Sequence, residues 1–109
     1  MQEPKIELSL QNSSLVNYVT EIHVQQTNAF LRAYKKLHHN QKDAVDQAVA
    51  DIVLNPDIGE PKKGDLAGIY VYKFKCARQL LLLAYEFDPK TRVLLLVGTH
   101  ENFYRNLKR

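Results

Sequence analysis

Residues 79–98, QLLLLAYEFDPKTRVLLLVG, hold two apolar runs on either side of a short polar segment, and most of the architecture follows from them. The runs at 79–87 and 92–98 are nearly continuous, which is typical of strands covered on both faces. The segment Asp88-Pro89-Lys90-Thr91 between them has the composition of a turn. The sequence therefore predicts a hairpin of two central strands.

A third strand is predicted just before this hairpin, at residues 69–75, IYVYKFK. Its residues alternate with a period of two, so that one face carries aromatic side chains and the other carries Lys73 and Lys75. The segment YVTEIHVQ, residues 18–25, also alternates and predicts a half-buried strand with His23 on its polar face.

The region between these strands has the apolar spacing of two helices. Thr27 is suited to cap the first helix, and Asn40 with Asp43 resembles a capping box for the second. Asn55-Pro56 ends the second helix, because the residue before proline is pushed out of the helical region. Residues 55–68 are predicted to be loop.

The predicted order is strand, helix, helix, three strands and a short C-terminal helix. It indicates an α+β fold, with a helical hairpin packed on a mostly antiparallel four-stranded sheet. One domain is expected over residues 18–109. Residues 1–17 form an N-terminal extension that either adds an edge strand or stays mobile.

The composition is that of an ordinary soluble globular protein, with a formal net charge of +3 and a single cysteine, Cys76. One cysteine excludes a disulfide framework and a cysteine-rich metal site. No segment has the roughly 20 apolar residues that span a bilayer, and no signal peptide is evident. We expect a cytoplasmic protein with no membrane association.

The chemically richest segment is the C-terminal one, VGTHENFYRNLKR, residues 97–109. His100 follows a buried strand and can exchange a proton near neutral pH. Tyr104 and Arg105 would lie beside it if the segment is helical. Lys73 and Lys75, about 7 Å apart on one strand face, could hold a phosphodiester.

Plainer interpretations of the same residues remain open. Strand lysines often serve solubility or protect a sheet edge from pairing. His100 and Glu101 could simply begin the last helix, with Thr99 as its cap. His38 and His39 are adjacent, which is poor spacing for a metal pair on a helix, and no metal or other cofactor is expected.

Three stretches carry a resemblance to a known family: residues 30–68, VYKFKCARQLLLLAYEF at 71–87, and LLLVGTHENFYRNLKR at 94–109. In this order they resemble the RelE/ParE superfamily of toxins from bacterial type II toxin–antitoxin modules. In detail the chain resembles the ParE-like branch, whose members end in a similar GxHENFYRxLK tail. The resemblance covers roughly residues 18–109.

The resemblance implies catalytic roles for four residues. Lys73-Phe74-Lys75 matches a K-x-K element that supplies cations at the scissile phosphate of ribosome-dependent members. His100 and Tyr104 match an Arg or His after the last strand and a Tyr a few residues later. Beside these four, we expect Arg78, Arg105 and Lys108 to bind the substrate.

One departure from the family pattern leaves the activity open. RelE-like nucleases carry a third-strand arginine where this chain has Leu82. The first hypothesis is a metal-independent endoribonuclease that cleaves mRNA on translating ribosomes. The alternatives are a ParE-type inhibitor of DNA gyrase, acting by protein contact, and an inactive toxin-fold protein that only binds antitoxin. Every version implies a cognate antitoxin as partner.

Overall fold

The computed structural model describes residues 21–108. The predicted extension at 1–17 and the first part of the strand predicted at 18–25 lie outside the described residues. The helices and strands are, in chain order, β1 (His23–Gln26), α1 (Asn28–Lys35), α2 (His39–Leu54), β2 (Glu60–Pro61), β3 (Tyr70–Cys76), β4 (Gln79–Phe87), β5 (Thr91–Thr99) and α3 (Phe103–Leu107). Short 3-10 turns, Pro56–Ile58 and Gly64–Leu66, flank β2.

The α+β prediction is confirmed, but the sheet has five strands rather than four, in the order β1-β5-β4-β3-β2. β1 runs parallel to β5, and the other neighbours are antiparallel. The missed strand is β2, which lies within the predicted loop at 55–68. It contains only Glu60 and Pro61, too few residues to show any alternation.

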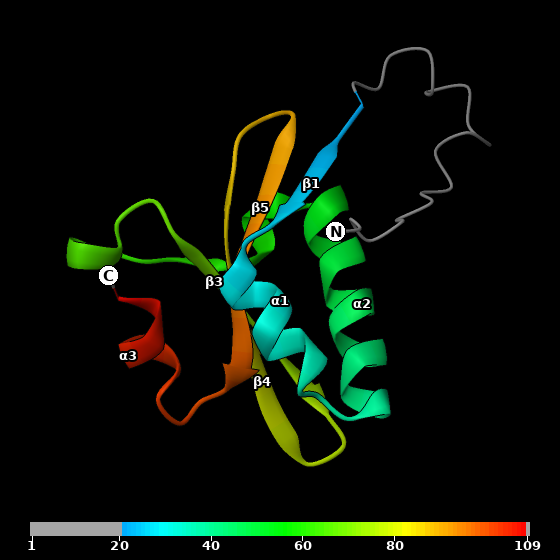
Figure 1. Ribbon diagram of the computed structural model, residues 1–109. Coiled ribbons are helices and arrows are strands. Elements are labelled where there is room, and N and C mark those ends of the chain that lie inside the picture. The colour runs from blue at the N-terminus through cyan, green and yellow to red at the C-terminus, as the bar shows by residue number, and fades with distance from the viewer. Residues whose placement is uncertain (1–20, 109) are drawn as a thin grey trace.

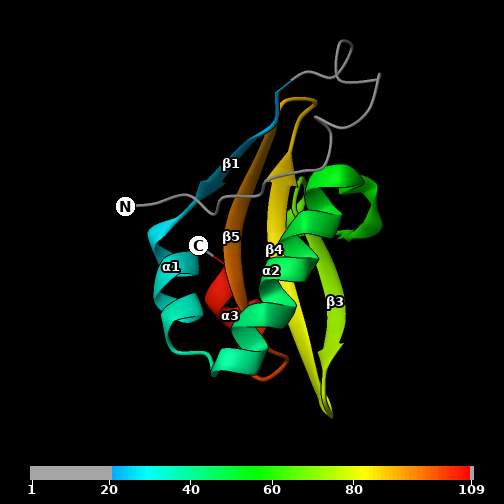
Figure 2. The ribbon, with the colours of Figure 1, turned by 90° about the vertical axis from the view of Figure 1, so that its right-hand side faces the viewer.

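Each face of the sheet is covered by its own helices. α1 and α2 lie on one face and α3 on the other (Figures 1 and 2). The aromatic residues of β3 pack under the helical hairpin, as the alternation predicted. The opposite face holds a second apolar cluster that includes Val71, Leu82, Leu95, Phe103 and Leu107. We call it the α3 cluster.

β4 is the central strand, and it contributes to both clusters. Leu81, Leu83 and Tyr85 pack under α1 and α2, whereas Leu82 and Ala84 belong to the α3 cluster. All five side chains are fully buried. This confirms the prediction made from the continuous apolar run.

β5 carries a bulge that the sequence did not reveal. Ala84 pairs with Leu96 and the next residue, Tyr85, pairs with Leu94, so Leu95 is the extra residue. The bulge places both Leu95 and Leu96 on the α3 side. It therefore supplies extra apolar surface for α3.

Thr27 ties the bulge to the helical hairpin. Its backbone N–H donates to the Leu94 carbonyl at 3.1 Å, and its hydroxyl donates to the Leu95 carbonyl at 2.9 Å. The same hydroxyl accepts the Phe30 N–H at 3.1 Å, which confirms Thr27 as the cap of α1. The cap of α2 was predicted wrongly: His38 is its N-cap, and the His38 N–H donates to Gln41 Oε1 at 2.8 Å.

A buried arginine fastens the far end of α2 to the sheet. Arg92, at the start of β5, donates from Nη2 to the Val53 carbonyl at 3.0 Å and from Nη1 to the Asp88 carbonyl at 2.7 Å. Burial lowers the pKa of Arg92, and Asp88 opposes that shift. The guanidinium thus satisfies a carbonyl of the last helical turn, where positive charge is favourable.

The first test concerns Thr27. Thr27→Ala removes the α1 cap and the hydroxyl contact to the bulge, so it should lower the free energy of unfolding by about 1–2 kcal/mol. Thr27→Ser keeps the hydroxyl and serves as the control. Chemical denaturation of both variants measures the difference, and equal loss in both would contradict a hydrogen-bonding role for the hydroxyl.

Candidate functional site

The site is built around His100 and Tyr104. His100 is exposed in the bend that follows β5, and Tyr104 lies half-buried on α3. Their ring centroids are 6.0 Å apart, in an edge-on arrangement with an interplanar angle of 75°. The predicted pairing is therefore present, although His100 is not on the helix. Thr99 is not the cap of α3 either, because the helix begins after Asn102, which has a left-handed backbone with φ 63°.

α3 is held by its apolar residues. Phe103 and Leu107 are buried in the α3 cluster, and the Phe103 ring meets the Tyr104 ring edge-on at 5.3 Å between centroids. Arg105 and Lys108 are exposed. The helix therefore turns its cations to solvent while its apolar side fixes the position of Tyr104.

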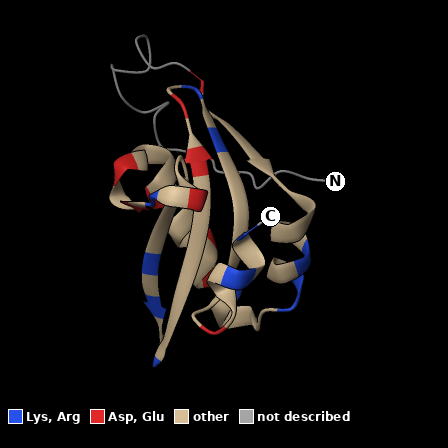
Figure 3. Ribbon diagram, turned by 90° about the vertical axis from the view of Figure 1, so that its left-hand side faces the viewer, with Lys and Arg blue, Asp and Glu red and all other residues tan. Residues whose placement is uncertain are grey.

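Lys73 and Lys75 lie on the same face of the sheet as α3. Lys73 of β3 pairs with Leu82 of β4, which belongs to the α3 cluster, and Lys75 pairs with Leu80 of β4. Cross-strand partners share a face of the sheet. Both lysines are exposed, and within residues 21–108 neither side chain makes an ion pair. Figure 3 shows basic segments on β3, at the tip of the β3–β4 hairpin and on α3, all seen from this side.

Arg78 does not join this group. It is exposed in the turn between β3 and β4, where it borders an open cavity of about 390 Å³. The other residues of this cavity come from the start of α2 and the hairpin itself: His38, Asn40, Gln41, Cys76, Ala77 and Gln79. The cavity opens beside the helical hairpin, which covers the opposite face of the sheet from α3.

Lys62 is a neighbour of Tyr104 that the sequence did not reveal. Its Nζ lies 5.1 Å from the centroid of the Tyr104 ring and 3.2 Å from Glu60 Oε1. Partial burial acts to lower the pKa of Lys62, but the side chains of Glu60 and Tyr104 outweigh this effect, and the pKa is raised. No local pattern signals the contact, because it depends on how β2 pairs with β3.

Leu82, which the resemblance aligned with an arginine of RelE-like nucleases, is completely buried in the α3 cluster. Its cross-strand partner is Gly98 of β5. A Cβ added to Gly98 would lie 3.9 Å from the Phe103 ring. Tyr85, which follows three residues later, serves the fold. Its hydroxyl donates to the Pro56 carbonyl at 2.6 Å and accepts the Gly59 N–H at 2.9 Å.

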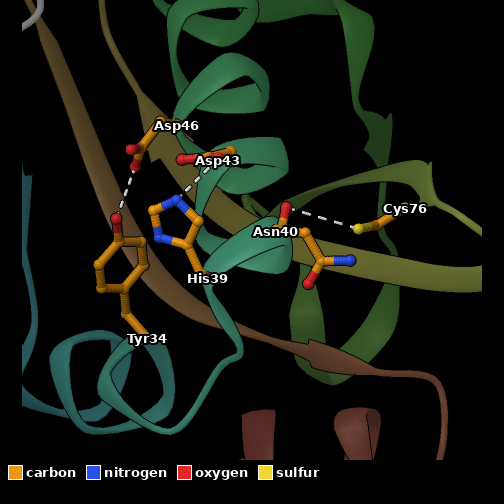
Figure 4. A network of polar contacts seen from close by, with 6 residues as sticks. All are labelled: Tyr34, His39, Asn40, Asp43, Asp46 and Cys76. Carbon is orange, nitrogen blue, oxygen red and sulfur yellow. Dashed lines mark hydrogen bonds and ion pairs between the residues drawn. The ribbon is translucent and has the colours of Figure 1, made fainter.

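The polar network at the helical corner lies apart from this site (Figure 4). Tyr34 donates to Asp46 Oδ1 at 2.8 Å, and His39 Nε2 lies 3.5 Å from Asp43 Oδ2. Burial and the Asp46 carboxylate raise the pKa of Tyr34 to about 12. Cys76 Sγ lies 3.5 Å from the Asn40 carbonyl.

The described residues contain neither a cluster of metal ligands nor a helix that could span a membrane. No group of three His, Cys, Asp or Glu side chains in residues 21–108 is placed to hold a metal ion. No helix in the same part of the chain is long and apolar enough to cross a membrane.

Solved structures of bacterial toxins share this architecture. A chain of the toxin–antitoxin complex RelBE2 from Mycobacterium tuberculosis is 26% identical, with a TM-score of 0.63 over 74% of this chain and 100% of that one. A mutant of Escherichia coli toxin RelE in the free state is 16% identical, with a TM-score of 0.64 over 82% and 94% of the two chains. The YoeB/ParE toxin from Agrobacterium tumefaciens is 15% identical, with a TM-score of 0.58 over 72% and 99%. The last two likenesses show the fold alone.

The particular family follows from the sequence. A family model described as the ParE-like toxin of the type II bacterial toxin–antitoxin system matches residues 24–108. This chain belongs to that family of toxins. The resemblance inferred from the three stretches of sequence is thereby confirmed. No curated protein matched the chain.

Leu82 supplies a direct test of the site architecture. Leu82→Arg would bury an unpaired charge under α3, and we expect the free energy of unfolding to fall by about 3 kcal/mol or more. Leu82→Met conserves volume and should cost less than about 1.5 kcal/mol. Thermal unfolding compares them; an arginine variant as stable as wild type would contradict the burial of this position under α3.

Proposed function

We propose that this toxin is an endoribonuclease that cleaves mRNA on translating ribosomes. The observation that supports it best is the exposed His100, paired with Tyr104, on the face of the sheet that also carries Lys73 and Lys75. An imidazole for proton transfer and free cations for a phosphate are the groups that RNA cleavage requires.

In the proposed reaction the 2′-hydroxyl next to the scissile bond attacks the phosphorus. The P–O5′ bond breaks, leaving a 2′,3′-cyclic phosphate and a free 5′-hydroxyl. Lys73 or Lys75 stabilises the negative charge that develops on the phosphate or aids deprotonation of the 2′-hydroxyl. His100 donates the proton to the leaving 5′-oxygen, or else takes the proton of the 2′-hydroxyl. The residues themselves supply the charge and the proton, so the reaction needs no metal ion.

Tyr104, the fourth predicted catalytic residue, and the three predicted substrate-binding residues act on the RNA itself. Tyr104 orients a base or a phosphate beside His100, since a phenol ring can stack on an unpaired base. Arg105 and Lys108 add positive potential from the solvent side of α3. Arg78 lies at the hairpin tip, so it would contact RNA away from the scissile bond.

A second candidate function is supported by Leu82. Because a buried leucine occupies the position of the family arginine, the phosphate site lacks one cation of the RelE-like set. The alternative is inhibition of DNA gyrase by protein contact. A toxin fold that only binds antitoxin would lack both activities.

An antitoxin partner is supported by the solved relatives. RelBE2 and E. coli RelBE are toxin–antitoxin complexes, and mutant E. coli RelE has been solved in complex with a peptide of the antitoxin RelB. For this chain we propose a cognate antitoxin whose extended or helical segment covers a sheet edge or displaces α3. The target of the toxin, which is the ribosome or gyrase, lies in the cytoplasm.

Translation in vitro with purified toxin and ribosomes tests the proposed activity. Wild type should cleave mRNA, and His100→Ala should cleave it about 100-fold more slowly or worse, because loss of a general acid or base has that effect. His39→Ala, at another exposed histidine on the helical corner, is the matched control. Intact mRNA together with blocked gyrase supercoiling would refute the nuclease and support the alternative.

Expression in cells tests the partner. The toxin alone should stop growth, and co-expression with its antitoxin, which we expect a small reading frame beside the toxin gene to encode, should restore growth. His100→Ala should remove toxicity while the protein still binds the antitoxin, since His100 is exposed and outside both apolar clusters. A wild-type toxin that is harmless alone would contradict the proposal.

A further inference from the structure

Lys62 is held in place by two backbone contacts of its segment. Its N–H donates to the Ile69 carbonyl at 2.9 Å, and the preceding residue, Pro61, pairs with Tyr70 of β3. The base of the side chain therefore has a defined position beside the sheet. Only 20% of the side chain is exposed, which is unusually little for a lysine.

The ammonium group of Lys62 contacts two residues, Glu60 and Tyr104, which are far from each other in the sequence. Glu60 Oε1 is 3.2 Å away, and the centroid of the Tyr104 ring is 5.1 Å away. A cation within about 6 Å of an aromatic centroid is attracted to the ring face. The carboxylate of Glu60 limits where the ammonium of Lys62 can move, and so it helps to keep the ammonium beside the Tyr104 ring.

Tyr104 is therefore restrained from three sides. Lys62 lies over the ring, while Phe103 and His100 meet it edge-on. His100 belongs to an exposed bend and has no hydrogen bond through its imidazole within residues 21–108. Within the described residues the imidazole therefore meets one ring, that of Tyr104, and the ammonium of Lys62 lies over the same ring.

We propose that Lys62 is a positioning residue, which fixes the Tyr104 ring and through it the imidazole of His100. The inference rests on the proposed nuclease function, because it assigns Lys62 to the step in which His100 transfers a proton. Precise placement of such a group strongly affects the rate of the chemical step. Lys62 acts through Tyr104 and does not itself contact the scissile phosphate.

Kinetics distinguish this role from simple RNA binding. Lys62→Met keeps the apolar stem but removes the charge, so single-turnover cleavage at saturating toxin should slow about fivefold, with the half-saturating concentration unchanged. Lys62→Arg, which keeps the cation over the ring, should restore most of the rate. Lys42→Met is the matched control, because Lys42 Nζ lies 5.7 Å from the Tyr34 centroid, on the helical hairpin.

A double-mutant cycle tests whether the effect passes through Tyr104. In a Tyr104→Leu background, Lys62→Met should cause no further loss of rate, because the ring it positions is gone. Independent, multiplicative losses would overturn the inference. So would a Lys62→Met variant that only weakens binding and leaves the saturated rate intact.

An NMR measurement separates failure of this inference from failure of the proposed function. In toxin labelled at its histidine and tyrosine rings, Lys62→Met should shift the ring signals of both His100 and Tyr104, and Lys42→Met should leave them in place. If wild type cleaves mRNA but Lys62→Met moves neither signal, the positioning role is wrong while the nuclease stands. If wild type cleaves nothing, the nuclease fails and the catalytic part of the inference is overturned with it; shifted signals would then leave only a structural contact.

Discussion

Burial of β4 on both of its faces is the constraint on which the rest of this structure depends. Leu81 through Tyr85 are inaccessible to solvent, and they alternate between the cluster under α1 and α2 and the cluster under α3. A strand of this kind requires a cover on each side. The long helical hairpin provides one cover, and a helix of only five residues completes the other.

The α3 cluster stabilises the fold and also holds the helix that carries Tyr104 of the candidate site. A helix as short as α3 is not stable alone in water, so Phe103 and Leu107 must be buried if Tyr104 is to have a fixed position. Leu82 lies in the same cluster. Leu82, the residue at which the sequence departs from the RelE-like pattern, therefore also packs in the cluster that seats the helix carrying Tyr104.

The candidate site takes its residues from three separate parts of the chain. Lys62 comes from the segment after β2, Lys73 and Lys75 from β3, and His100 and Tyr104 from the C-terminal segment. The strand pairing brings the first two parts together, and the docking of α3 brings the third. The cations of β3 remain exposed and make no ion pair with any residue of 21–108, whereas Lys62 is engaged with Glu60 and Tyr104.

The sequence by itself determined the central hairpin, the helical hairpin, the Thr27 cap and the exposure of Lys73 and Lys75. These features follow from apolar periodicity and turn composition, which are local. Only the tertiary structure decided the two-residue strand β2, the bulge at Leu95, the start of α3 after Asn102 and the contact between Lys62 and Tyr104. Those features depend on strand register and on packing between distant segments. Lys62 and Tyr104, for example, are about 40 residues apart in the sequence. No local sequence pattern specifies the register of these strands or this packing.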